Sequence, residues 1–560
     1  MNSNFSTIKI AGPAGSGIKS SGQIFSKLLI NSFFNLLDYS EYPSLVRGGH
    51  NTYQISFSAD PLYFVFSKVD LFFSVYPGHW QQHVKEFTKN TLVFSDEETP
   101  KNVNFKFFKL PLTDLATQAG SRLVINTFCI GVAVYLYNLD ANLAKKLMCQ
   151  AYGKYSDLNT TAFNLAYQYA SQNFSDLRIK LNFPKKKTKL GFYDGNEAFG
   201  WGFIKGGGNF YAAYPMTPAT GTLHFLAAKQ TEHNLTVVHP EDEIAAANMA
   251  AGAAFAGARA GTGTSGGGFA LMNEAVSFCG VAEIGMVYYL VSRPGPATGL
   301  PTWTAQGDLM HAIYSGHGEF PKVVLAPGDA QESFEMGVSS LNLAAQLQTP
   351  IIVVSDKMIG ESGASTTYLP DSKVKIEKGE IETKPTTNFK RYSFTKNGIS
   401  PLTLPGTPNG EFLSNSYEHD EFGFSTEDEI LSKKMFDKRM AKTKLAIKLA
   451  PKANFFGTEK AKKLIVSWGS PKGSILQALS MIKNKEDYAF LQIKTLWPIN
   501  PDLQKLISPF KEIIVIENNG TNQLVSLLKS QFDFNPTSII NKNDGRPFFV
   551  EEIIKLLEKK

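Results

Sequence analysis

The sequence predicts an α/β protein built from several domains. Apolar runs with the character of buried strands alternate with helical segments rich in alanine, a rhythm typical of parallel sheets covered by helices. The chain has 560 residues, of which 43% are hydrophobic. A single hydrophobic core stops growing at roughly 250 to 300 residues, so a chain of this length is expected to divide into several domains.

We expect five successive segments. Residues 1–180 open with the strand IKIAG, the turn GPAGSG and the helical pattern GQIFSKLLINSFF, and form a first α/β domain. Residues 181–190 form a basic linker. Residues 191–360 contain the strands EIGMVYYLVS, PKVVLAPG and TPIIVVSD, and form a doubly wound parallel sheet. Residues 361–455 form a connecting segment with one helix in TEDEILSKKMFDKRMAKTKLAIKLA. Residues 456–560, with AKKLIVSWGS, YAFLQIKTL and KEIIVIENNG as strands, form a third α/β domain.

Charge and cysteine content limit the classes of function. The net charge of +6 is small for this length, and we interpret the run Lys185–Lys189 as a solvated linker rather than a nucleic-acid arm. No apolar run is long enough to span a membrane, and the opening MNSNFSTIK lacks the apolar segment of a signal peptide, so we expect a cytoplasmic protein. Three widely spaced cysteines cannot hold an iron–sulfur cluster by themselves. Any electron-carrying centre is therefore expected in another chain.

A glycine-rich turn follows the first strand. Gly12, Gly15 and Gly17 lie in GPAGSG, where the amide groups of a helix start can hold a phosphate. Their spacing is not GxGxxG, and a tight turn also requires glycine. Downstream, EYPSLVRGGHN places Arg47 and His50 around two glycines, which suits anion binding and ordinary turn chemistry equally. Both interpretations remain open on these residues alone.

Three carboxylates, Glu241, Asp242 and Glu243, precede a helical segment of small residues. A carboxylate at a helix start is stabilised by the positive end of the macrodipole, so a capped and tightly packed helix accounts for any one of them. The loop TGTSGGG follows this segment, and the loop YPMTPATG precedes it. Small-residue loops beside several strand ends are typical of a cofactor cleft at the edge of an open α/β sheet.

Four segments in order carry a family resemblance: AAYPMTPATG, PEDEIAAANMAAGAAFAGARAGTGTSGGGFALM, RPGPATGLPTWTAQGDL and GHGEFPKVVLAPGDAQESFE. Together they resemble the alpha subunit of 2-oxoacid:ferredoxin oxidoreductases, in the form in which a gamma domain is fused in front of alpha. GPAGSGIKSSG and EYPSLVRGGHN resemble the gamma part, and VIENNGTNQL and NDGRPF resemble later segments of the family. The resemblance implies a gamma-type α/β domain, a thiamine-diphosphate pyrimidine-binding domain and a C-terminal α/β domain like that of transketolases.

The resemblance also implies a catalytic acid. Enzymes of this family use thiamine diphosphate, and its activation requires a carboxyl group at N1′ of the aminopyrimidine. The family pattern assigns this role, and with it a cofactor contact, to Glu243. Glu241 is the alternative, and Asp242 is then expected to be a helix cap or a solvated acid.

Substrate and cofactor contacts are implied in the loops around this acid. By resemblance, Thr217 of YPMTP is expected to donate to the substrate carboxylate, Arg293 of VSRPG to pair with it bidentately, and Pro215 to contact the cofactor. Three departures from the family pattern affect this region: TSGGG lacks a proline among its glycines, PGPA stands for GGPS, and WTAQ stands for an Arg-Thr-Glu-Gln version. Trp303 and Ala305 are therefore expected to reshape the pocket.

The chain lacks the motif with which thiamine enzymes hold magnesium and diphosphate, a GDG followed at a distance by a pair of asparagines. By resemblance, we expect no metal ligands in this chain. A beta subunit is expected to bring the diphosphate site, Mg²⁺ and an iron–sulfur cluster, in an alpha2beta2 heterotetramer that reduces ferredoxin. Coenzyme A is expected near the gamma part, with Gly12, Gly15, Gly17 and Arg47 at its phosphates.

The function implied by the resemblance is the oxidative decarboxylation of a 2-oxoacid to acyl-coenzyme A and CO₂, with one-electron transfer to ferredoxin. We favour 2-oxoglutarate as the substrate, because the fused form that contains GLPT resembles that branch most; pyruvate or a branched-chain 2-oxoacid is the alternative. A non-catalytic scaffold or regulatory paralogue of the same fold is a second alternative. The joint presence of Glu243, Thr217 and Arg293 argues against it. A nucleotide-binding dehydrogenase that uses GPAGSG is disfavoured, because no acidic residue follows a proper GxGxxG at the usual distance.

Overall fold

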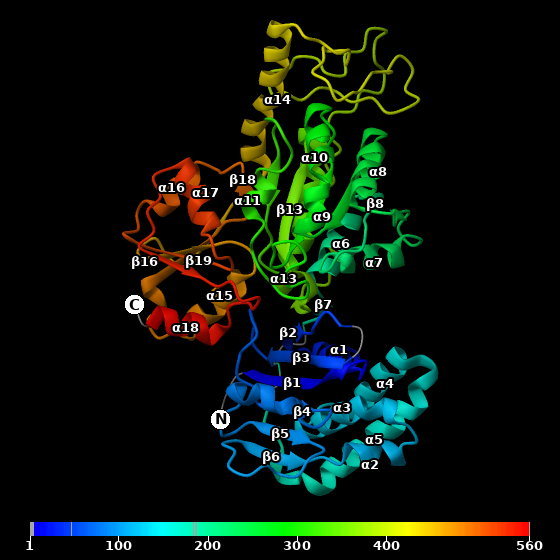
Figure 1. Ribbon diagram of the computed structural model, residues 1–560, viewed down its shortest axis with the longest axis vertical. Helices are drawn as coiled ribbons and strands as arrows, with labels where there is room; N and C mark the ends of the chain where they lie inside the picture. Colours follow the sequence, from blue (N-terminus) through cyan, green and yellow to red (C-terminus); the bar gives the residue numbers. More distant parts are fainter. Residues whose placement is uncertain (1–4, 46–47, 183, 185–187, 559–560) are drawn as a thin grey trace.

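Three β-sheets organise the chain (Figure 1). The computed structural model describes residues 5–45, 48–182, 184 and 188–558. Arg47 and residues 185–187 of the basic run lie outside the described residues. In Figure 1 the N-terminal part, coloured blue to cyan, lies below the other two parts, which lie side by side.

The N-terminal sheet has eight strands. In spatial order they are β6 (Lys106–Lys109), β5 (Leu92–Ser95), β4 (Leu71–Ser74), β1 (Phe5–Ala14), β3 (Gly48–Ser58), β2 (Asn35–Glu41), β14 (Ala364–Thr366) and β7 (Gly191–Tyr193). The strands from β6 to β1 are mutually parallel, and from β1 to β7 each neighbouring pair is antiparallel. The helices of this part are α1 (Ile18–Asn31), α2 (Leu112–Gln118), α3 (Ile125–Leu136), α4 (Ala141–Tyr152) and α5 (Ser156–Asn173).

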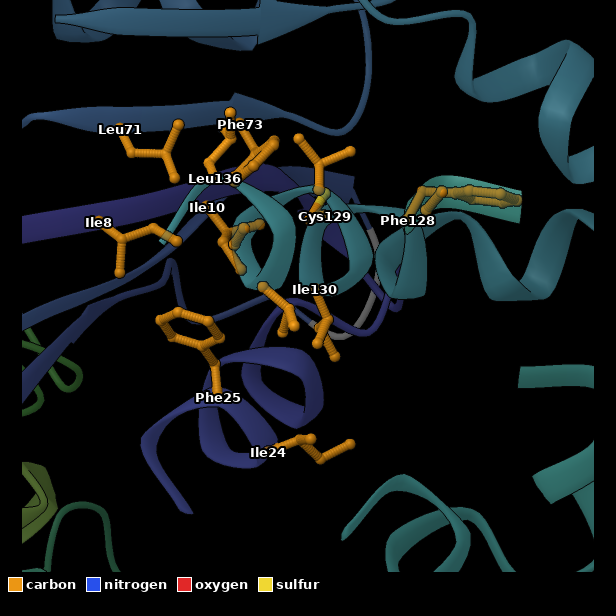
Figure 2. Packing of buried hydrophobic residues seen from close by; sticks show 14 of the residues in the cluster. Ile8, Ile10, Ile24, Phe25, Leu71, Phe73, Phe128, Cys129, Ile130 and Leu136 are labelled. Carbon is orange, nitrogen blue, oxygen red and sulfur yellow. The ribbon is translucent and has the colours of Figure 1, made fainter. Parts of the chain in front are cut away.

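The core of this part lies between the sheet and the helices α1 and α3 (Figure 2). Ile8 and Ile10 of β1 point into this core, because alternate residues of a strand face the same side. Lys9 between them is also buried, and its Nζ lies 2.7 Å from the Oε2 of Glu86. Cys129 of α3 lies within the core, and burial raises the pKa of its thiol to about 12. This cysteine is therefore an unreactive packing residue.

The last two strands of this sheet come from distant parts of the chain. Ala364 of β14 pairs with Leu37 of β2 on one side and with Tyr193 of β7 on the other. Beside this junction, Asp38 and Gly363 exchange two hydrogen bonds, from the Asp38 amide to the Gly363 carbonyl over 2.8 Å and from the Gly363 amide to Asp38 Oδ1 over 2.7 Å. Residues before and after the central domain thus complete the N-terminal sheet.

The central sheet has seven strands, and six of them are parallel. In spatial order they are β18 (Thr495–Trp497), β12 (Val323–Leu325), β13 (Ile351–Asp356), β11 (Val287–Ser292), β10 (Ala260–Thr264), β8 (Phe210–Ala212) and β9 (Thr236–Val238). Only β18 is antiparallel to its neighbour. The associated helices are α6 (Gly195–Lys205), α7 (Thr220–Lys229), α8 (Glu243–Phe255), α9 (Gly266–Leu271), α10 (Asn273–Val281), α11 (Leu309–Ile313), α12 (Ala330–Leu347) and α13 (Lys357–Glu361).

Strand β11 shows why helices cover both faces of this sheet. All six of its residues are buried, as expected of a central parallel strand. Tyr288 and Leu290 pack in the cluster that contains residues of α8 to α11, while Val287, Tyr289 and Val291 pack in the cluster that contains residues of α6, α7 and α12. This arrangement confirms the predicted doubly wound α/β fold.

The C-terminal sheet has five strands. In spatial order they are β15 (Asn454–Phe456), β17 (Tyr488–Gln492), β16 (Lys463–Ser467), β19 (Glu512–Glu517) and β20 (Ser538–Asn541), with the helices α15 (Pro471–Met481), α16 (Asp502–Ile507), α17 (Gln523–Gln531) and α18 (Val550–Glu558). The prediction of one strand in YAFLQIKTL was wrong. The segment divides into β17 in this sheet and β18 in the central sheet, because Lys494 accepts a hydrogen bond from Ala326 and turns the chain toward β12.

The segment between the central and C-terminal sheets contains the expected helix, α14 (Glu429–Leu449), whose N-cap is Asp428. This helix rises past the central sheet in Figure 1, and the yellow loops of the same segment lie beside its upper end. Short 3₁₀ turns complete the described elements: His79–Glu86, Arg122–Val124, Gly153–Tyr155, Ser175–Leu177, Leu369–Asp371 and Lys485–Asp487.

Candidate active site

The candidate site lies at the carboxyl ends of the central strands. From β8 the chain continues to β9 on one side of it, and then returns to β10 on its other side. Open α/β sheets bind their ligands at such a reversal of strand order. The loops that follow β8, β9, β10 and β11 therefore meet at the edge where a ligand is expected.

The three acids before α8 have different surroundings. Glu241 is exposed to solvent. Asp242 is the N-cap of α8, and its Oδ1 accepts a hydrogen bond from the Ala245 amide over 2.8 Å, which confirms the cap expected at this position. Glu243 is the first residue of the helix and is only 4% exposed. Its Oε1 has no hydrogen-bond partner among the described residues.

The glycine loop after β10 makes room for Glu243. A Cβ on Gly268 would lie 2.7 Å from the Oε1 of Glu243 and 2.1 Å from the Oγ1 of Thr264. No atom lies within 4 Å of a Cβ placed on Gly267. The close approach of the Glu243 carboxylate therefore requires glycine at position 268. Gly267, the middle glycine, faces open space; it lies in the part of the loop where the family pattern contains a proline.

The residues predicted to bind substrate lie in adjacent loops. The guanidinium of Arg293, after β11, donates from Nη1 to the backbone carbonyl of Thr217, after β8, over 2.7 Å. Burial lowers the pKa of Arg293, and the charge of Asp308 opposes this shift. Both Arg293 and Thr217 are half-buried, as is Pro215. Met216, between Pro215 and Thr217, approaches the glycine loop, since its sulfur accepts from Thr264 Oγ1 over 3.6 Å.

Sequence reasoning missed Asp308. This residue precedes α11, and its carboxylate oxygens lie 2.8 and 2.9 Å from a Cβ placed on Gly266. Burial raises the pKa of Asp308, while hydrogen bonding to Ser292 and the positive charge of Arg293 oppose this shift. The signal available in the sequence is an acid directly before a short apolar helix, in GDLMHAI, a stretch that lacks the sequel of a diphosphate motif.

Several buried polar atoms without hydrogen-bond partners lie at this edge. Among the described residues they include atoms of Glu243, Ser265 and His311, and others occur elsewhere in the chain. Buried polar groups are nearly always hydrogen-bonded, so the unpaired ones at this edge are available to a polar ligand. An acid, a hydroxyl and an imidazole suit the mixed donors and acceptors of an aminopyrimidine, so these residues fit the thiamine cofactor that the resemblance implies.

The predicted glycine turn lies on the N-terminal sheet, away from the central strands. Gly12 belongs to β1 and pairs with Asn51 of β3. Gly15 and Gly17 have positive φ angles of 86° and 76°, and Gly17 is the N-cap of α1. A Cβ on Gly17 would lie 2.6 Å from the amide nitrogen of Asn126, so packing and backbone conformation already account for this glycine.

All three parts of the chain line a cleft of about 500 Å³. His50 and Glu41 belong to the N-terminal sheet, Trp303 to the central domain and Arg546 to the C-terminal part. The guanidinium of Arg546 lies 3.5 Å from the centroid of the Trp303 ring, and its Nε lies 3.6 Å from the Oε1 of Glu41. Trp303 therefore lines this interdomain cleft. Ala305 is buried.

Three histidines form a chain beside this cleft. His50 Nδ1 lies 2.7 Å from His79 Nδ1, and His50 Nε2 lies 2.6 Å from His83 Nε2. His83 Nδ1 in turn lies 2.7 Å from the Oε1 of Glu86. Burial and the neighbouring His83 and His79 lower the pKa of His50 to about 4, so this ring is neutral near pH 7. No group of metal-binding side chains was found among the described residues.

Comparison with known proteins agrees with this geometry. The family model described as pyruvate ferredoxin/flavodoxin oxidoreductase matches residues 7–169, and the model described as pyruvate flavodoxin/ferredoxin oxidoreductase, thiamine diphosphate-binding, matches residues 202–437. The fold and the site thus define a thiamine-diphosphate-binding oxidoreductase subunit. Within the part of the chain that the structure describes, no helix is both long and apolar enough to cross a membrane.

Individual relatives show to which family within this class the chain belongs. The alpha subunit of 2-oxoacid:ferredoxin oxidoreductase from Saccharolobus solfataricus is 32% identical, over 97% of this chain and 96% of its own. The chain therefore belongs to the family of 2-oxoacid:ferredoxin oxidoreductase alpha subunits, which are components of multisubunit enzymes. The 2-oxoglutarate synthase subunit KorA of Methanothermobacter thermautotrophicus is 29% identical over 66% of this chain and 99% of its own, so this chain contains sequence that KorA lacks.

A solved structure matches the whole chain. The 2-oxoglutarate:ferredoxin oxidoreductase from Magnetococcus marinus, with 2-oxoglutarate, coenzyme A and succinyl-CoA bound, superposes with a TM-score of 0.93 at 28% identity and covers 100% of both chains. The order of the N-terminal, central and C-terminal parts is therefore an arrangement shared with an enzyme of this family.

Proposed function

We propose that this chain, together with a beta subunit, decarboxylates 2-oxoglutarate oxidatively to succinyl-coenzyme A. The observation that carries this proposal is the buried carboxylate of Glu243, whose free Oε1 lies at the same sheet edge as the joined pair Thr217 and Arg293. The 2-oxoglutarate enzymes among the relatives support this substrate. Thiamine diphosphate, when bound, supplies the nucleophilic carbon that attacks the keto group and accepts the electrons left by decarboxylation.

Glu243 is proposed to hold a proton at Oε1 for the N1′ atom of the aminopyrimidine. Its side chain is buried, and its Oε1 has no competing donor among the described residues. Asp242 already satisfies the Ala245 amide. Glu243 is thus left free for the cofactor, and Pro215 is proposed to contact the cofactor from the loop after β8.

Arg293 and Thr217 are proposed to hold the substrate carboxylate. The bond from Nη1 to the Thr217 carbonyl fixes the guanidinium and leaves its other N–H groups for an anion. The Thr217 hydroxyl supplies a further donor. The pair would present the 2-oxoacid with its keto carbon toward the Glu243 side of the edge.

Coenzyme A is proposed to enter through the cleft between the three parts of the chain. Lys9 lies on its N-terminal side and Arg546 on its C-terminal side, so cations are available for phosphate groups, and the neutral ring of His50 beside Lys9 adds a hydrogen-bonding group. Gly12 pairs with Asn51, the residue next to His50, and this pairing supports a contact between the proposed glycine turn and coenzyme A. Gly15, Gly17 and Arg47 stay predicted contacts of the same ligand.

A beta subunit is proposed to cover the surface beside Glu243. Ile244 and Met249 of α8 and Leu271 of α9 are 49%, 42% and 52% exposed, which is unusual for large apolar side chains that neighbour a buried acid. The partner would bring the diphosphate site with Mg²⁺ and an iron–sulfur cluster, and would pass single electrons to ferredoxin. We propose an alpha2beta2 assembly in the cytoplasm.

An anaerobic viologen-reduction assay tests the proposal. The complex purified through this chain would receive thiamine diphosphate, Mg²⁺, coenzyme A and a panel of 2-oxoacids, and wild type would be compared with Glu243→Gln. We expect 2-oxoglutarate to be oxidised best, and the variant to lose about 10²- to 10⁴-fold in rate, the range typical of a positioned acid–base group. Glu241→Gln, at the exposed neighbour, is the matched control and should retain wild-type activity.

Each other outcome has a defined meaning. Preference for pyruvate or a branched-chain 2-oxoacid would correct the substrate and leave the catalytic residues in place. Loss of activity in Glu241→Gln with an active Glu243→Gln would move the catalytic role to Glu241. No reduction with any 2-oxoacid, in a complex whose iron–sulfur partner is intact, would contradict the enzymatic role and favour a non-catalytic scaffold.

A further inference from the structure

A second cavity lies at the opposite edge of the central sheet. It has a volume of about 310 Å³, at the lower end of the range typical of small-molecule sites. Residues just before β8, β10 and β11 line one side of it, among them Asn209, Arg259 and Ile284. The candidate active site lies where these strands end, on the order of 20 Å away along β11. The cavity is thus separate from that site.

The walls of the cavity are mainly apolar. The central domain contributes Phe255, Ile284 and Leu341, and the segment before α14 contributes Leu404 and Phe412. Such walls suit a hydrocarbon body, which gains free energy in proportion to the apolar area removed from water. Because the two sets of walls come from different parts of the chain, an occupant would contact both.

One end of the cavity is cationic. Arg391 lines it and is only 2% exposed. Its Nη1 donates to Gln348 Oε1 over 3.3 Å and its Nη2 to the Glu283 carbonyl over 3.0 Å, both neutral acceptors. Its remaining N–H groups have no acceptor among the described residues. A guanidinium held in this way has donors available for a carboxylate.

The buried charges around Arg391 do not balance. The carboxylate of Glu283 lies 2.5 Å from Lys438 Nζ and 2.6 Å from Lys442 Nζ, and all three side chains are buried. Arg391 is the third buried cation of this group, against a single carboxylate. Burial lowers the pKa of Lys442 to about 7, and this shift removes only part of the excess positive charge.

Two exposed residues at the rim, Lys378 and Glu380, offset each other, and Arg259, which lines the cavity and donates only to neutral acceptors, adds to the excess of positive charge. Buried charge is costly unless it is paired. An anion bound at Arg391 would therefore be favoured by the charges of the described residues.

We infer that this cavity is a binding site for a monocarboxylic acid with an apolar body. The carboxylate would pair with Arg391, and the hydrocarbon chain would lie between Leu341 and Phe412. The inference does not depend on the proposed function, because no residue of the candidate active site takes part. An occupant would bridge the central sheet and the segment before α14.

Calorimetric titration with octanoate tests this inference on the complex purified through this chain. We expect saturable binding of one octanoate per copy of the chain, at least tenfold weaker binding of octanol, and no binding of octylamine. Arg391→Met should weaken octanoate binding about tenfold or more, since it removes a charged hydrogen-bonding partner. Ala258 is half-buried in the cavity wall, so Ala258→Phe should fill the cavity and prevent octanoate binding. Circular dichroism would show whether both variants are folded.

Further variants separate this site from the active site. Arg293→Met should leave octanoate binding unchanged, because Arg293 lies at the other edge of the sheet. Absence of saturable octanoate binding to the wild type would overturn the inference. So would octanoate binding that persists undiminished in folded Ala258→Phe, or that disappears in Arg293→Met alone. Equal affinities for octanoate and octylamine would also overturn it, because the charge argument would then have failed.

Discussion

Arg293 donates a 2.7 Å hydrogen bond to the backbone carbonyl of Thr217, and so joins the loop after β11 to the loop after β8. The two strands are not neighbours, because β10 lies between them. The bond spans the ligand-binding edge and holds a planar cation in one orientation. A lysine at the same position would offer a point charge without this geometry.

Replacement of Arg293 by lysine should therefore impair substrate binding. We expect the KM for the 2-oxoacid to rise about tenfold to hundredfold, since a hydrogen bond to a charged group contributes roughly 1.5 to 3 kcal/mol. Steady-state kinetics with viologen as acceptor would measure this change. Arg178→Lys, a substitution in the N-terminal part, is the matched control. An unchanged KM in Arg293→Lys would exclude the proposed carboxylate contact.

Replacement of Gly268 by alanine should destabilise the central domain. The new Cβ would meet Thr264 Oγ1 at 2.1 Å and Glu243 Oε1 at 2.7 Å, so the acid or the loop must move. Such overpacking costs roughly 1 to 3 kcal/mol of the free energy of unfolding. Gly267→Ala is the control, because no atom lies within 4 Å of its added Cβ. Thermal unfolding of both variants distinguishes the positions, and equal melting temperatures would show that the loop adapts freely.

The lowered pKa of Lys442 should make the free energy of unfolding depend on pH. Burial lowers the pKa of this residue from 10.5 to about 7, so between these pH values the unfolded chain binds more protons than the folded one. The free energy of unfolding therefore decreases as the pH falls from 10.5 toward 7. Urea unfolding at several pH values should show this loss in wild type and a smaller one in Lys442→Met. Lys444→Met, on the exposed side of α14, should behave as wild type, and parallel curves for all three proteins would contradict the prediction.

The lowered pKa of His50 should make the folded protein less stable at acidic pH. Burial and the adjacent His83 and His79 lower its pKa from 6.5 to about 4, and the unfolded chain therefore takes up its proton first. The stability due to the neutral ring is present above pH 6.5 and is lost as the pH falls toward 4. Melting temperatures at pH 7 and pH 4.5 should differ less in His50→Gln than in wild type. His224→Gln, at an exposed position, is the control; if it alone removed the difference, the assignment to His50 would be wrong.

The sequence contains strong local signals for the central domain and its edge. Buried strands such as β11 are continuous apolar runs, because both of their faces are covered. The local sequence did not distinguish the acids before α8, and only the family resemblance favoured Glu243; the structure caps the helix with Asp242 and buries Glu243. Asp308 was missed because its relation to Gly266 depends on a contact between two loops that are distant in the chain.

Strand pairing between distant parts of the chain also could not be predicted from the sequence. β14 pairs with β2 across more than three hundred residues, and β18 leaves its own domain to pair with β12. Neither strand has more than three residues, which is too short for a periodic pattern. Their partners are set by where the surrounding domains place them, and this information is not present in any local stretch of sequence.

The origin of β14 has a consequence for the synthesis of the protein. Until the ribosome has added residues 364–366, the nascent N-terminal sheet ends at β2, whose outer backbone groups have no strand to pair with. An unpaired sheet edge is a template for association with other chains. The N-terminal part therefore remains prone to association with other chains while the central domain is being synthesised. A protein truncated after residue 180 would keep the unpaired edge of β2 permanently.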